Sequence, residues 1–91
     1  MFEINTLKAL VSNYTPTPIA KTEPIAQSGS HRVYTRIFLA DGTTLMGAYN
    51  DDLKENEAFF SFTDFFLKEK INVPKILIIS KNREYYLLED L

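Results

Sequence analysis

The stretch QSGSHRVYTRIFLADGTTLMGAY, residues 27–49, decides the fold of this chain. Successive residues from Val33 to Leu39 alternate between a mostly apolar face and a mixed face, which is the period of a β-strand. Asp41-Gly42 follows as a tight turn, because glycine accepts the positive φ that hairpin turns require. TTLMGAY, residues 43–49, is the return strand. The sequence therefore predicts strand, turn and strand, preceded by a small polar loop.

The residues before this hairpin predict a helix and an edge strand. Apolar side chains recur at helical spacing over residues 3–13, and the prolines of TPTP end that helix because proline cannot continue it. Residues 19–26, IAKTEPIA, are extended in character. Pro24 fits an edge strand, since it donates no hydrogen bond to a neighbour.

The residues after the hairpin predict a long helix and two more strands. Asp51 or Asp52 can cap the helix, with Glu55 completing a capping box. Phenylalanines at positions 59, 62 and 66, beside a second stripe at 53, 60 and 67, form a wide apolar face that needs a sheet to cover it. Asn72 to Pro74 end the helix, and residues 75–80 and 84–90 read as strands around a polar turn.

These elements predict an α+β fold, a single domain over residues 1–91. It would consist of a five-stranded antiparallel sheet with one long packed helix and a short N-terminal helix.

Composition excludes several classes of function. The net charge of −2 and the scattered basic residues disfavour nucleic acid and acidic membranes as partners. The chain has no cysteine and a single histidine, His31, so no metal site is expected. His31 is expected at the surface. No apolar run is long enough to cross a bilayer and the N-terminus lacks the features of a signal peptide, so a cytoplasmic protein is expected.

Two features suggest phosphate chemistry, and each also has an ordinary explanation. Ser28, Gly29 and Ser30 have the small side chains of a loop that can cradle phosphate, with Arg32 adding charge, but one glycine between serines also makes an ordinary turn. Glu57 lies at the border of the apolar helix face. It is either a solvated acid near Lys54 or an acid that orients a phosphate-binding cation.

Three segments taken in order carry a resemblance to a known family. SGSHRVYTRI, NEAFFSFTDFFLKEKINVPKIL and YYLLEDL resemble the N-terminal lobe of the aminoglycoside phosphotransferase and choline kinase-like superfamily, relatives of the protein kinases. Within it, SGS-x-R-x-Y-x-R and LLEDL are similar to the bacterial sugar-kinase-like branch. The resemblance covers nearly the whole chain, and it rests on the order and spacing of its parts.

The resemblance implies binding of ATP with Mg²⁺. Ser28, Gly29 and Ser30 would lie over the β- and γ-phosphates, and Glu57 would be the helix acid. Backbone groups of the adenine-binding hinge would come from Leu88, Glu89 and Asp90, and apolar walls from Met46 and Ile76.

The chain departs from the family pattern at its third strand, where kinase-like lobes carry a lysine that pairs with the helix acid. The matching position, near Ala48 or Tyr49, is not cationic. Either Arg32, Arg36 or Lys54 supplies the charge, or nucleotide binding is altered or weak.

The resemblance assigns no catalytic residue to these 91 residues, because the family's catalytic loop and metal-binding aspartate belong to a C-terminal lobe. We therefore expect the ATP-binding lobe of a phosphotransferase that acts on a small hydroxylated molecule such as an amino sugar, aminoglycoside or choline-like compound. Its partner would be the missing lobe, and the piece alone would be inactive and bind ATP weakly. The alternative is a free-standing interaction module without catalysis, which would self-associate through an apolar cleft face near YYLLEDL.

Overall fold

The computed structural model describes residues 1–25 and 31–91 and contains two helices and one antiparallel sheet of five strands. In chain order the elements are α1 (Ile4–Tyr14), β1 (Ile19–Pro24), β2 (Val33–Leu39), β3 (Thr44–Tyr49), α2 (Leu53–Lys68), β4 (Ile76–Ile79) and β5 (Tyr85–Glu89). The predicted α+β fold is confirmed, with each predicted element present.

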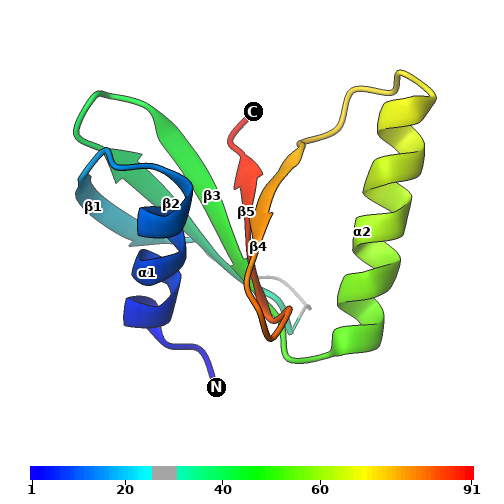
Figure 1. The fold of residues 1–91 in the computed structure, drawn as a ribbon, viewed down its shortest axis with the longest axis horizontal. Coiled ribbons are helices and arrows are strands. Elements are labelled where there is room, and N and C mark those ends of the chain that lie inside the picture. Colours follow the sequence, from blue (N-terminus) through cyan, green and yellow to red (C-terminus); the bar gives the residue numbers. More distant parts are fainter. Residues whose placement is uncertain (26–30) are drawn as a thin grey trace.

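The strands lie in the order β1-β2-β3-β5-β4, so the strand that ends the chain is inserted beside β3 (Figure 1). β1 is an edge strand and contains Pro24, as predicted. The β2–β3 hairpin turns at Asp41-Gly42, where Gly42 has a φ of +90°. The chain reaches β4 only after passing through α2, and the turn after β4 then brings β5 back between β4 and β3.

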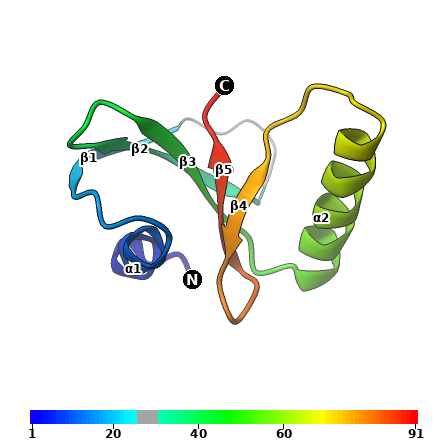
Figure 2. The same ribbon diagram turned by 45° about the horizontal axis from the view of Figure 1, so that its top comes forward.

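One face of the sheet packs tightly against α1, as Figure 2 shows from the side. Leu7, Leu10 and Val11 of α1 are buried against apolar side chains of β2, β3 and β5. Gly47 of β3 makes this contact close, because a Cβ there would stand 2.8 Å from the methyl carbons of Leu7. The larger of the two core clusters therefore lies between α1 and the sheet.

The first half of α2 contacts the other face of the sheet through aromatic side chains. Phe60 lies edge-on to Tyr86 of β5, with ring centroids 5.1 Å apart, and Phe59 lies 5.5 Å from the same ring. Tyr86 and Leu88 face this side of β5, while Tyr85 and Leu87 face α1. Because successive side chains of β5 point to opposite faces, this one strand contributes to the packing on both faces of the sheet. All four of these β5 residues are buried.

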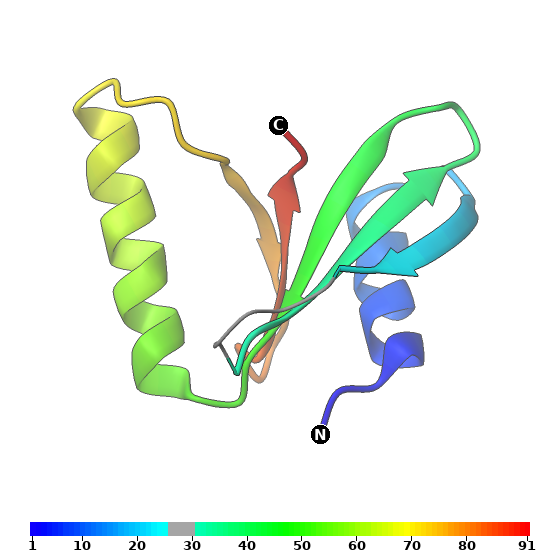
Figure 3. The ribbon, with the colours of Figure 1, turned by 180° about the vertical axis from the view of Figure 1, so that it is seen from behind.

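The second half of α2 corrects the prediction of a fully covered phenylalanine face. Phe62, Phe65 and Phe66 are 61%, 55% and 36% exposed. In the view from behind, α2 runs alongside the sheet and is joined to β4 by a long connection over residues 69–75 (Figure 3). We call these three phenylalanines the α2 aromatic surface. Only Phe60 and, in part, Phe59 enter the core.

Candidate functional site

A pocket of about 430 Å³ lies where β2 and β3 meet the end of β5. Four residues predicted to contact a nucleotide line it: Met46, Leu88, Glu89 and Asp90. The register explains the arrangement, because Arg36, Met46 and Leu88 are successive partners across β2, β3 and β5 and share one face. The lining is completed by Ile25, Tyr34, Phe59, Pro74 and Leu91.

An ion pair closes one side of this pocket. Nε and Nη2 of Arg36 donate to the two carboxylate oxygens of Asp90, at 2.9 and 3.3 Å. Burial acts to raise the pKa of Asp90, but hydrogen bonds from Thr44 and Arg36 and the Arg36 charge outweigh it and leave that pKa below its usual value. The two-pronged contact fixes the residue that follows β5.

Glu89 is bound to the main chain of the segment that leads into β4. Its N–H donates to the Lys75 carbonyl at 3.0 Å, and its Oε1 accepts from the Lys75 N–H at 2.8 Å. One backbone donor of the predicted hinge is therefore occupied. The Glu89 N–H already has a partner in Lys75, so an adenine would need donors elsewhere along residues 88–91.

Arg32 and Glu55 form a second ion pair beside the pocket. Nη2 of Arg32 donates to Glu55 Oε1 at 3.1 Å, and its guanidinium carbon lies 4.9 Å from the centre of the Phe59 ring. Nη1 of the same arginine lies 3.5 Å from the Tyr34 hydroxyl. Burial acts to lower the pKa of Arg32, but the contact with Tyr34 and the nearby tyrosines and Glu55 raise it overall. Arg32 thus stays cationic while mostly buried against two residues of the pocket lining.

Two buried asparagines anchor this end of α2. Asn50, directly after β3, donates to the same Glu55 oxygen at 3.1 Å and accepts from the Asp52 N–H. Asn56 donates to the carbonyls of Asn50 and Arg83 at 2.7 and 2.9 Å. Asp52 caps the helix through the Glu55 N–H, as predicted. The Glu55 side chain, however, turns to Asn50 and Arg32, so the capping box is only half formed.

Glu57 does not take the place predicted for the helix acid. Both of its carboxylate oxygens are bound by Arg83, in the turn between β4 and β5, and both side chains are about half exposed. The hydrogen bond from Arg83 is the main reason that the pKa of Glu57 lies below its usual value. Glu55, two residues earlier, is the acid that reaches a cation beside the pocket. Sequence reasoning did not identify Glu55 as a residue of the site, because its predicted role in the capping box already explained an acid at this position.

The position at which the resemblance predicts a third-strand lysine is flanked by aromatic side chains. Ala48 is buried between its strand partners Tyr34 and Tyr86. Burial is the main cause that raises the pKa of the Tyr86 hydroxyl well above its usual value, so this phenol stays neutral. Lys54 is exposed, and Arg36 is bound by Asp90.

Other predicted positions are placed differently or lie outside the description. Ser28, Gly29 and Ser30 are not among the described residues, and their role stays a prediction. Ile76 packs into the cluster around Phe60 and lines a separate, smaller pocket. His31 is exposed, in agreement with the prediction.

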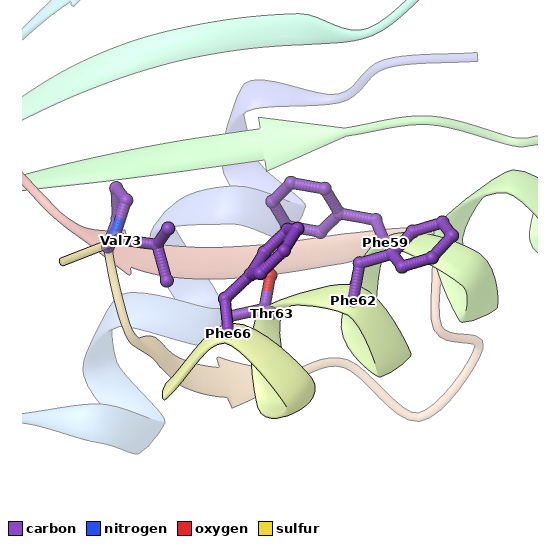
Figure 4. A pocket seen from close by; sticks show the side chains of 6 residues that line it. Phe59, Phe62, Thr63, Phe66 and Val73 are labelled. Atoms are coloured by element: carbon purple, nitrogen blue, oxygen red, sulfur yellow. The ribbon is translucent and has the colours of Figure 1, made fainter. Parts of the chain in front are cut away.

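The α2 aromatic surface borders a different pocket, of about 440 Å³. Phe62 and Phe66 project from α2 next to Thr63 and Phe59, with Val73 across from them (Figure 4). Pro74 completes the lining, and it also lines the pocket at β5. The two pockets are thus neighbours that share Phe59 and Pro74.

Comparison with known proteins identifies no relative. No protein-family model matches the chain, and no curated protein or solved structure matches it either. Among the described residues, no helix is both long and apolar enough to traverse a bilayer.

Proposed function

We propose that these 91 residues are the nucleotide-binding lobe of an ATP-dependent phosphotransferase acting on a small hydroxylated molecule. The observation that carries the proposal is the pocket at the end of β5, which is lined by Met46 of β3 together with the consecutive residues Leu88, Glu89 and Asp90. An apolar floor with polar groups at one rim suits a flat heteroaromatic base.

The arrangement of the elements supports the same proposal. β1 and β2 pair antiparallel up to Pro24 and Thr35, and residues 26–30, which include the predicted phosphate loop, come between these two strands in the chain. Ile25, directly before that segment, lines the pocket. The resemblance drawn from the sequence also requires a helix between the third and fourth strands, and α2 occupies that place in the chain.

The reaction would move the γ-phosphoryl group of ATP to an acceptor hydroxyl, giving a phosphate ester and ADP with release of the hydroxyl proton. Positioned metal ions and a group that orients the acceptor are needed for that step. The site residues described above bind and orient a nucleotide. Amino sugars, aminoglycosides and choline-like compounds are all acceptors of the proposed class, and their recognition would require the family's second lobe.

Titration of the isotope-labelled chain with adenosine and with Mg-ATP tests this proposal. We expect saturable NMR shifts at Met46 and at residues 88–91, with dissociation constants in the millimolar range because these 91 residues contact the nucleotide from one side. The M46E variant places a charge on the pocket floor and should abolish these shifts. The matched F62E variant, on the α2 aromatic surface, should keep them. Shifts that are absent, or that M46E leaves unchanged, would contradict the proposal.

A non-catalytic interaction module is the second candidate, and the α2 aromatic surface favours it. Three phenylalanines are exposed on neighbouring turns of one helix, and a contiguous apolar patch is typical of a protein interaction site. Sedimentation of the chain over a range of concentrations tests it. Self-association that F62S and F66S together remove, without any nucleotide binding, would support the module over the kinase lobe.

A further inference from the structure

We infer that Arg32, held in place by Glu55, is the cation that binds the nucleotide's phosphates in place of a lysine on β3. This inference rests on the proposed function. Nη2 of Arg32 lies 3.1 Å from Glu55 Oε1; Arg32 directly precedes β2, and Glu55 lies in the first turn of α2. The pair therefore joins the sheet to the helix, as a strand lysine and a helix acid do in kinases.

Arg32 contacts two residues of the pocket lining. Its guanidinium stacks over Phe59 and approaches the Tyr34 hydroxyl, and both of these residues line the pocket. It follows Ser30, the last residue of the predicted phosphate loop, by two positions in the chain. A base lying over Met46 and Leu88 would have Arg36 beside it, because the three residues are partners across β2, β3 and β5, and its phosphates would extend toward Arg32.

The other basic residues near the site are placed for different tasks. Arg36 forms an ion pair with Asp90, directly after β5, and is therefore suited to hold the hinge in place. Arg83 is bound by Glu57 in the exposed β4–β5 turn. Lys54 is exposed on the outer side of the first turn of α2. Arg32 combines proximity to the pocket lining with a fixed position, and a guanidinium is well matched to phosphate oxygens.

Asn50 acts as a positioning residue for this pair. Its side-chain amide donates to Glu55 Oε1 at 3.1 Å, the same oxygen that accepts from Arg32. Asn50 is fully buried directly after β3, the strand on which kinases carry the lysine. The end of β3 therefore fixes the acid rather than the cation. Glu55 in turn fixes Arg32, which directly precedes β2.

The test compares how much the phosphates add to binding in three forms of the chain. The measured quantity is the ratio of the dissociation constant for adenosine to that for Mg-ATP, followed by NMR at Met46 and residues 88–91. In the wild type this ratio exceeds one. R32Q should lower it by about tenfold or more, the usual effect of losing a charge-assisted hydrogen bond, while the affinity for adenosine stays unchanged. R32K should give an intermediate ratio.

R83Q is the matched control, because Arg83 also pairs with an acid of α2 and its loss removes the same charge. It should leave the ratio unchanged. The wild-type chain supplies a reading that does not depend on folding of a variant: the side-chain Nε–H signal of Arg32 should move with Mg-ATP and not with adenosine.

Each outcome is decisive. If R32Q keeps the wild-type ratio, if R83Q lowers it equally, or if the Arg32 signal ignores Mg-ATP, this inference is overturned while nucleotide binding stands. If neither adenosine nor Mg-ATP shifts the pocket residues, the proposed function fails and the inference with it.

Discussion

Arg36 and Asp90 show how single side chains hold the rim of the pocket. The carboxylate is one-tenth exposed and accepts two hydrogen bonds from one guanidinium, at 2.9 and 3.3 Å. Arg36 belongs to β2, whereas Asp90 follows β5, so the pair spans the width of β3. It ties the end of the chain to the floor of the pocket.

This pair predicts a stability that depends on pH in the acid range. Because the folded-state pKa of Asp90 is below its unfolded value of 3.8, the contribution is complete well above pH 4 and is lost as the pH falls through the folded-state pKa. We expect urea unfolding at pH 6 to show D90N less stable than the wild type. The difference should shrink toward pH 3.

E57Q is the control for this measurement, since Glu57 also has a lowered pKa but lies in an exposed pair with Arg83. Exposed pairs contribute little to stability. The wild type and E57Q should therefore lose stability in parallel on acidification. A gap between the wild type and D90N that stays constant from pH 6 to pH 3 would show that the ion pair makes no such contribution.

The helix α2 is divided into a packed half and an exposed half. Phe60 sits edge-on against Tyr86 and close to Ala48 and Leu88, whereas Phe65, little more than one turn later, is 55% exposed. The same residue type thus has two different roles within six positions of one element.

Substitutions of the two phenylalanines should separate these roles. F60A should lower the free energy of unfolding by about 3–4 kcal/mol, because it removes a buried ring and leaves a cavity against Tyr86. F65A removes the same atoms from solvent-exposed surface and should change it by less than about 0.5 kcal/mol. Chemical denaturation followed by circular dichroism measures both. Equal losses in the two variants would mean that the second half of α2 is packed as well.

Sequence periodicity predicted the elements well because local rules govern them. Gly42 and the alternation of β2 settle the hairpin without reference to the rest of the chain, and Pro24 settles the edge strand. The burial of α2 could not be predicted in the same way. An apolar stripe indicates which side of a helix avoids water, but how far along the helix a sheet reaches depends on the tilt between them.

The candidate site shows the same limit at the level of single residues. The family resemblance predicts that Met46, Leu88 and Asp90 lie at one site, and they do share one pocket. Glu55 and Glu57 are both acids on α2, and no pattern in the sequence indicates which of them meets an arginine near the pocket. That choice is made by Asn50, whose buried amide holds Glu55 through a contact formed only in the folded chain.

At the scale of the whole molecule, the sheet has one firmly packed face and one loosely packed face. α1 buries three apolar side chains, and Gly47 lets Leu7 approach the backbone of β3. α2 is longer, but its buried residues are Phe60, Thr63 and Asn56, only one of them apolar. The pocket at the end of β5 lies on the loosely packed side.

This asymmetry predicts the order in which the molecule opens. Local unfolding needs less free energy where few apolar contacts are buried, so amide hydrogens of α2 should exchange with solvent before those of β2, β3 and β5.

N56A should speed exchange in α2 further, because the carbonyls of Asn50 and Arg83 lose their donor. Exchange in α1 should stay unchanged. N13A, at the exposed end of α1, is the matched asparagine control and should leave α2 as in the wild type. Hydrogen–deuterium exchange read by NMR resolves each element. If the amides of α2 exchange as slowly as those of β3, the helix unfolds together with the sheet as one cooperative core. The pocket would then lie on a part of the molecule that does not open locally.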